Sequence, residues 1–126
     1  MHYRILSLLT ATLLALSGSA AASLCVLPAP DGGDIEPSPP SLIGTILSVA
    51  PGQVVVRVAG TANPHRVVVA EATELFTVYG GGFEVQDLRP GLHALIWFKG
   101  CTPPKQDQPV AAVLQVCSLA PEPCPR

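Results

Sequence analysis

The segment R-P-G-L-H-A-L-I-W-F-K, residues Arg89–Lys99, decides the fold. Its first three residues predict a sharp turn, because proline fixes φ and glycine tolerates the conformations that turns require. The residues after the turn alternate, with Ala94, Ile96 and Phe98 on one face and His93, Leu95, Trp97 and Lys99 on the other. A period of two residues is typical of a β-strand with two different faces. We therefore predict a strand over His93–Lys99.

Further short strands lie outward from this segment, separated by turns rich in glycine and proline. A polar, proline-rich loop at 103–109 leads into a last apolar run, and Pro51-Gly52 marks a turn between two upstream runs. The predicted strands cover residues 42–49, 53–59, 65–71, 93–99 and 110–116, with a strand or turn at 75–79 and local pairing at 83–86. Val54, Val56 and Val58 share one face of the second strand, and Val67 and Val69 are predicted to point inward from the third.

This pattern predicts an all-β fold. Beyond the first 22 residues, no stretch shows the 3.6-residue period and the caps of a helix. Five strands are few for a two-sheet sandwich, and a closed or nearly closed barrel hides strand edges better than an open sheet. We predict a small OB-like barrel of five to six strands over residues 42–117, with a simple sandwich as the alternative.

Proline-rich extensions flank the predicted barrel. Residues 23–41 contain five prolines, which lock φ and remove backbone donors, so we expect an extended, semi-rigid leader. Residues 118–126 form a proline-rich tail. The acidic run Asp31–Glu36 lacks the ligand spacing of a calcium loop and predicts a solvated turn.

The first 22 residues, 1–22, have the layout of a secretory signal peptide. A positive start at Met1–Arg4 precedes the apolar run Ile5–Leu16, and three alanines end at Ala22. The twelve apolar-run residues would span about 18 Å as a helix, too short for a bilayer core of about 30 Å. We expect cleavage after Ala22, a periplasmic or secreted protein, and no transmembrane segment in the remaining chain.

Cleavage there would leave 104 of the 126 residues, about the length of one domain. It would also remove Arg4, leaving six basic and nine acidic side chains and a formal charge of −3. Nucleic-acid binding needs a basic stripe that neutralises phosphates. We therefore expect no nucleic-acid partner.

Four cysteines follow the predicted cleavage site: Cys25, Cys101, Cys117 and Cys124. An even number in a small exported chain predicts two disulfides, with three connectivities open. A bacterial lipoprotein would instead be cut directly before Cys25 and carry lipid there. Leu24 is too bulky for that cleavage position, and lipidation would leave an odd number of cysteines, so we do not expect a lipid anchor on Cys25.

The run of turns and strands resembles a known class of domain. Its features are G-T-I-L-S-V at Gly44–Val49, a V-x-V strand, A-T-E-L-F at Ala72–Phe76, D-L-R-P-G-L-H-A-L-I-W at Asp87–Trp97, and A-A-V-L-Q-V at Ala111–Val116. Over about residues 42–117 the chain resembles small exported bacterial OB-like β-barrel domains of unknown function. The resemblance implies a fold and a compartment but no catalytic residues, and the cysteines and proline-rich ends depart from its simplest members.

An OB-like topology would also favour one pairing of the cysteines. It would place the start of the first strand beside the end of the fourth, so Cys25 could reach Cys101. Cys117 and Cys124 would then close a small loop after the last strand. We favour this pairing while the other two connectivities stay open.

The candidate reactive side chains do not form a recognisable catalytic set. His65 and His93 are the only histidines after Ala22, fewer than the three or four ligands of a zinc or copper site. The obvious carboxylates, of which a glycosidase needs a facing pair, are Glu71, Glu74, Glu84 and Asp87. Nothing in the sequence fixes such a pair. We expect no catalytic residues, no metal ion and no cofactor.

Trp97, Tyr79 and His93 are the candidate contacts for a ligand or partner. OB-type barrels bind oligosaccharides or single strands by stacking on exposed aromatic side chains. Trp97 falls on the strand face opposite Ile96. If that face points outward, Trp97 and Tyr79 form a contact site, and if it points inward, Trp97 belongs to the core.

The preferred hypothesis is an exported, non-enzymatic β-barrel module, stabilised by disulfides. It would bind another envelope or extracellular protein, or a saccharide, or contribute to a cell-envelope assembly. The first alternative is a small exported hydrolase or carbohydrate-binding domain that uses two of His93, Glu84 and Asp87. The second alternative is a periplasmic metal-handling protein, for which only the histidines and cysteines argue.

Overall fold

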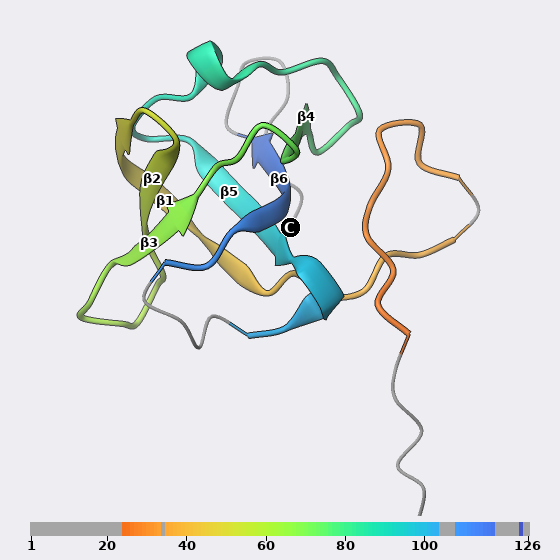
Figure 1. Ribbon diagram of the computed structural model, residues 1–126, viewed down its shortest axis with the longest axis horizontal. Helices are drawn as coiled ribbons and strands as arrows, with labels where there is room; N and C mark the ends of the chain where they lie inside the picture. Colours follow the sequence, from red (N-terminus) through yellow and green to blue (C-terminus); the bar gives the residue numbers. More distant parts are fainter. Residues whose placement is uncertain (1–23, 34, 104–107, 118–123, 125–126) are drawn as a thin grey trace, which may run out of the picture.

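The computed structural model describes residues 24–33, 35–103, 108–117 and 124. This part of the chain is all-β, as predicted, with two short 3₁₀ turns. The elements are β1 (Leu42–Ala50), β2 (Gln53–Arg57), β3 (His65–Val68), β4 (Glu74–Thr77), η1 (Val85–Asp87), β5 (His93–Phe98), η2 (Lys99–Cys101) and β6 (Ala111–Cys117) (Figure 1). The predicted signal peptide, Met1–Ala22, and all of the predicted tail except Cys124 lie outside the described residues. None of the helices described is both long enough and apolar enough to cross a membrane.

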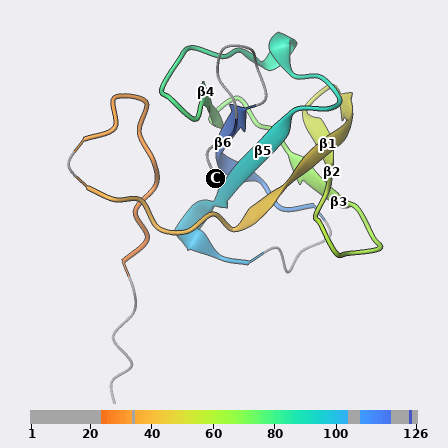
Figure 2. The same cartoon turned by 180° about the vertical axis from the view of Figure 1, so that it is seen from behind.

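Six strands in the described residues form one mixed sheet in the order β3-β2-β1-β5-β6-β4. All neighbouring strands are antiparallel except β4 and β6, which run parallel from Glu74 opposite Val113 to Thr77 opposite Val116. In both views of the molecule, β1, β2 and β3 lie on one side of β5, and β6 and β4 lie on the other (Figures 1 and 2).

The prediction of a closed barrel is wrong, because the sheet stays open between β3 and β6. A strand has two edges, and β5 and β4 occupy those of β6. Only Val110, just before β6, bridges to Val68 at the end of β3, where the Val68 N–H donates to the Pro109 carbonyl oxygen (2.9 Å). The parallel pairing of β4 with β6 therefore takes the edge that β3 would need for closure.

The strand β1 is shared between two partners. Its first half pairs with β5 and its second half with β2, and Thr45 has a partner on both sides. Gly44 lies beside this junction. A Cβ at Gly44 would lie 2.6 Å from Val56 Cγ1 and would overlap the Arg57 carbonyl oxygen. The missing side chain therefore permits the close approach of β1 to β2.

The main core is built from one of the two alternating faces of each of three strands. Each of these faces is buried: Val54, Val56 and Val67, with Val69 beside them, and Ala94, Ile96 and Phe98 from β5. Val58 is partly buried and packs against the same cluster. The prediction that Val67 and Val69 point inward is confirmed, and the face of β5 left open by the sequence is settled, because Ala94, Ile96 and Phe98 lie in the main core.

A second, smaller cluster lies on the opposite face of β5. It consists of Phe76 from β4, Trp97 from β5 and Val113 from β6, with Leu95 and Cys101 packed against it. Since residues that alternate along a strand point to opposite faces, Trp97 cannot share the main core with Ile96 and Phe98. Phe76 and Val113 bury part of the Trp97 ring, and chain outside the strands must cover the rest.

The prediction of local strand pairing at 83–86 is wrong. Phe83 packs against the main core, and Val85–Asp87 form the 3₁₀ turn η1. The Glu84 N–H donates to Asp87 Oδ2 (3.1 Å), so an acidic side chain supplies the acceptor at the start of this turn.

Candidate functional site

The leader is a closed loop, not the extended segment that its prolines predict. The Val26 N–H donates to Ser38 Oγ (2.9 Å), and the Ser38 N–H donates to the Val26 carbonyl oxygen (2.9 Å). Residues 26–38 between these bonds are the leader loop. A surface loop whose ends meet in this way is an Ω-loop. Proline content predicts stiff backbone, but it cannot show that two residues 12 positions apart hydrogen-bond to each other.

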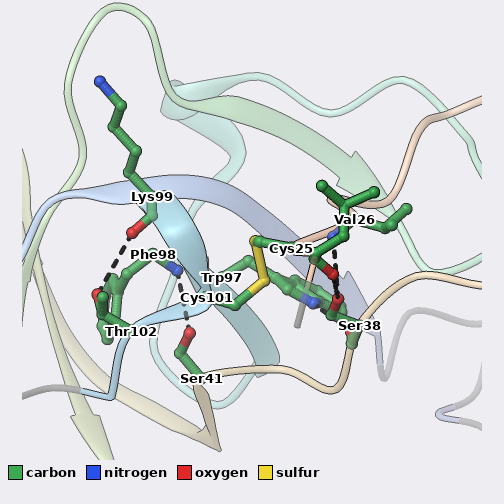
Figure 3. The surroundings of a disulfide bond; sticks show 10 residues. Cys25, Val26, Ser38, Ser41, Trp97, Phe98, Lys99, Cys101 and Thr102 are labelled. Carbon is green, nitrogen blue, oxygen red and sulfur yellow. Dashed lines mark hydrogen bonds between the residues drawn. A yellow bond between two sulfur atoms is a disulfide. The ribbon is translucent and has the colours of Figure 1, made fainter. Parts of the chain in front are cut away.

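The base of the leader loop is hydrogen-bonded to β5. The Trp97 indole Nε1–H donates to the Ser38 carbonyl oxygen (2.7 Å). Three residues later, the Ser41 N–H donates to the Ile96 carbonyl oxygen (2.8 Å), and Ser41 Oγ accepts the Phe98 N–H (3.2 Å). Figure 3 shows the Trp97 ring reaching past the disulfide toward Ser38. The leader therefore supplies the cover that buries Trp97.

Two disulfides fix the ends of the fold. Cys25, just before the leader loop, is bonded to Cys101 in η2, with a Cα–Cα distance of 5.5 Å. Cys117 at the end of β6 is bonded to Cys124, with a Cα–Cα distance of 4.9 Å. These are the two pairs that an OB-like strand arrangement favours. The first bond occupies the Cys25 sulfur, which a lipid anchor would require.

A groove of about 560 Å³ separates the leader loop from the sheet. Residues 27–29 of the leader loop form one wall, and residues 110–113 of β6 and its approach form the other. The loop between β3 and β4 closes one end through Ala70, Ala72, Thr73 and Glu74, and Lys99 lies at the rim. We call this feature the leader groove.

The surface of the leader groove is aliphatic or small, apart from two exposed charged side chains, Glu74 and Lys99. Thr73, which is 9% exposed, donates from Oγ1 to the Ala111 carbonyl oxygen (2.6 Å) and accepts the Ala70 N–H (2.9 Å). This hydroxyl ties the β3–β4 loop to β6. The groove thus combines an apolar lining with one acidic and one basic group, which suits an apolar ligand with polar ends.

Gly80 holds the far end of the leader loop close to the sheet. Its φ is +82°, and a Cβ at this position would overlap the Pro30 carbonyl oxygen. Both the left-handed conformation and the close approach require glycine. The turn after β4 therefore contacts the leader loop, as the base of that loop contacts β5.

The three predicted contact residues do not gather at the leader groove. Trp97 is 2% exposed, so its ring offers no face on which a ligand can stack, and the core interpretation holds for this residue. Tyr79, in the turn after β4, is 60% exposed. His93 is exposed on β5, where Nδ1 and Thr45 Oγ1 lie 3.2 Å apart in a hydrogen bond.

The candidate catalytic and metal-binding residues have ordinary structural surroundings. Glu84 and Asp87 are exposed and belong to the cap of η1, and His65 lies half-buried at the start of β3. All four cysteines are in disulfides. Among the residues that the structure describes, no group of three or more histidine, cysteine, aspartate or glutamate side chains is placed to hold a metal ion.

Comparisons of the chain with protein-family models, with curated proteins and with solved structures found no match. The sequence did not predict the leader groove. One signal was available, because Cys25 directly precedes a short apolar segment, residues 26–29, and this indicates that the leader packs against the sheet.

Proposed function

We propose that this chain is an exported, non-enzymatic binding module whose leader groove takes an extended apolar segment of another envelope or extracellular protein. The observation that carries the proposal is the groove itself. One of its walls belongs to a segment outside the sheet, and a disulfide joins that segment to Cys101 in η2, the turn that follows β5. A wall that is fixed before binding lowers the ordering cost of association.

The lining of the groove favours a protein segment over a saccharide. Saccharide sites on small β-barrels use exposed aromatic faces, and the described groove lining consists of alanine, valine, leucine and proline with Thr73, Glu74 and Lys99. The apolar side chains of a bound segment would move out of water into the groove, which is favourable. Lys99 and Glu74 would interact with the polar groups of that segment. A volume of about 560 Å³ lies in the usual range for ligand pockets.

The two disulfides support export as part of this proposal. Disulfides persist in oxidising compartments and are rare in the reducing cytosol. The layout of residues 1–22 as a signal peptide points the same way. Together they support a periplasmic or secreted protein.

The strand order supports an OB-like assignment in an open form. β1 pairs with both β2 and β5, β5 pairs with β6, and the end of β3 bridges to the residue before β6. An OB-fold is a five-stranded, partly open barrel. Here β4 would be an addition that pairs along the outer edge of β6.

A matched pair of substitutions tests the binding site. Short peptides selected by phage display on the oxidised protein would be titrated by calorimetry against wild type, Ala72→Trp and Ala62→Trp. Ala72 is exposed and lines the leader groove, whereas Ala62 is exposed in the β2–β3 loop, away from the groove lining. We expect the bulky ring in the groove to weaken binding by about tenfold or more, and the same ring at Ala62 to leave it unchanged. Failure to select any peptide, or equal affinities of both variants, would contradict the proposal.

A further inference from the structure

The leader loop is attached to the sheet by hydrogen bonds at its base and by one disulfide, and it contacts Gly80 at Pro30. The hydrogen bonds that residues 24–37 make with other described residues stay within the leader, ending at Ser38 at the latest. Ser38 itself is bonded to Trp97. For the segment that forms the groove wall, residues 27–29, the Cys25–Cys101 bond is therefore the covalent restraint nearest in sequence.

Each cysteine of this bond is two positions along the chain from a residue that lines the leader groove. Cys25 is two residues before Leu27, which belongs to the wall at residues 27–29. Cys101 is two residues after Lys99, which also lines the groove. Figure 3 shows the Lys99 side chain leaving the same short turn that holds Cys101. A change in the bond therefore acts on two sides of the groove at once.

The turn that carries Cys101 is held in an unfavourable backbone conformation. Cys101 has φ +54°, the one non-glycine residue with a positive φ among the described residues, and Gly100 before it has φ +72°. A left-handed conformation is costly for a residue with a Cβ, and it persists only where the surroundings impose it. Opening the bond to Cys25 would let Cys101 leave the left-handed conformation. We therefore expect the backbone of this turn to change in the reduced form.

The Cys25–Cys101 bond is also open to approach from the surface. A hollow of about 380 Å³ lies against both sulfur-bearing residues, lined mainly by serine and proline from residues 38–41. Cys25 and Cys101 are half-buried, as is Cys124 of the other bond, whose partner Cys117 is 1% exposed. Thiol–disulfide exchange needs a path for the attacking thiolate, and this hollow supplies one at Cys25–Cys101.

We propose that the Cys25–Cys101 bond is a redox clasp that holds the wall of the leader groove in place and the groove competent for binding, and that a dithiol reductant opens it. This regulatory role rests on the proposed function of the groove.

One thiolate of the reductant attacks a sulfur of the clasp, the S–S bond breaks, and a mixed disulfide forms. The second thiol of the reductant then displaces the bound cysteine. The reductant ends as a disulfide, and Cys25 and Cys101 each end as a thiol, having received two electrons and two protons in total.

Opening the clasp uncovers the cluster around Trp97. Cys101 packs against Phe76, Trp97 and Val113, and the leader covers the same face. With the loop released, water reaches the indole ring and the groove loses the wall at residues 27–29. Trp97 is the single tryptophan of the chain, so its emission reports this event alone.

The test is a stepwise reduction with dithiothreitol, followed by alkylation and mass analysis of the labelled cysteines. We expect Cys25 and Cys101 to be labelled before Cys117 and Cys124. At that stage the Trp97 emission shifts to longer wavelength, while the far-ultraviolet circular dichroism of the strands is retained. Three results would each contradict the proposed redox clasp. They are earlier reduction of Cys117–Cys124, an unchanged Trp97 emission, and simultaneous loss of the circular dichroism signal of the strands.

Paired variants separate the clasp from simple stabilisation. The double variant Cys25→Ser/Cys101→Ser should bind the selected peptides at least tenfold more weakly than wild type, and Cys117→Ser/Cys124→Ser should bind them as wild type does. Equal binding by both variants would contradict the proposal that the Cys25–Cys101 bond controls binding. If the oxidised wild type selects no peptide, the proposed function fails, and the labelling order and Trp97 emission still decide whether the clasp opens.

Discussion

At the scale of single residues, the contact between the leader loop and the sheet depends on one missing side chain. Gly80 combines φ +82° with a close approach to the Pro30 carbonyl oxygen. Gly60 has almost the same backbone conformation, φ +80°, but a Cβ there would have no heavy atom within 4 Å. Alanine at Gly60 would therefore cost only the free energy of the left-handed conformation. Alanine at Gly80 would add the free energy of displacing the leader.

We predict that Gly80→Ala destabilises the protein more than Gly60→Ala. A left-handed alanine alone costs about 1–2 kcal/mol, and this is the expected loss at Gly60. At Gly80 the added methyl group must also move Pro30, so we expect a further loss of about 1 kcal/mol or more, as for overpacking. Urea unfolding gives both values, and only Gly80→Ala should shift the native Trp97 emission. Equal losses with unchanged emission would show that the leader loop does not contact this turn.

At the scale of elements, the strands follow from alternating side chains and the burial of one face. On β2, Val54 and Val56 are 0% exposed, while Val55 between them is half-buried on the other face. The same residue type thus occupies both environments within one strand.

We predict that Val56→Ala costs about 2 kcal/mol of unfolding free energy, from two lost methyl groups and the cavity that remains. Val55→Ala should cost less than half as much, since its side chain already meets solvent. Chemical denaturation of the two variants measures the difference. A register in which Val55 is the buried residue would reverse the order, because a one-residue slip exchanges the two faces.

Strand positions could be predicted from the sequence because they depend on local patterns. The alternation at His93–Lys99 predicts β5 and the opposite faces of Ile96 and Trp97, and the runs upstream predict β1 to β3 within a few residues. Whether the Trp97 face is solvated depends on the leader, which is 59 residues away from it at Ser38. Local patterns carry no information about such a contact. The same reason applies to β4, whose parallel pairing with β6 leaves the barrel open.

Site residues were harder to predict than strands, again for a physical reason. The prominent side chains Trp97, Tyr79 and His93 stand out by residue type, but the leader groove is made of alanine, valine, leucine and proline, which have no such signature. The bond between Cys25 and Cys101 and the hydrogen bonds at the base of the leader loop bring its two walls together. A cavity formed between distant segments becomes visible only in three dimensions.

At the scale of the whole molecule, the disulfides connect the extensions to the sheet. In the chain-entropy model, the Cys25–Cys101 bond, with its separation of 76 residues, contributes about 4.5 kcal/mol, and the Cys117–Cys124 bond, with a separation of seven, about 2.4 kcal/mol. The larger constraint thus falls on the segment that forms the groove wall. The leader is consequently part of the folded domain.

The exchange rate of the Trp97 indole N–H tests this central claim most directly. The chain has one tryptophan, so nuclear magnetic resonance shows one indole proton after the sample enters deuterated water. With both disulfides intact, the bond to the Ser38 carbonyl oxygen and the burial of the ring should make this proton exchange far more slowly than a free indole. In Cys25→Ser/Cys101→Ser the protection should fall while the amides of Val54 and Val56 stay protected. Exchange at the rate of a free indole in the oxidised wild-type protein would contradict a leader that is bound to the sheet.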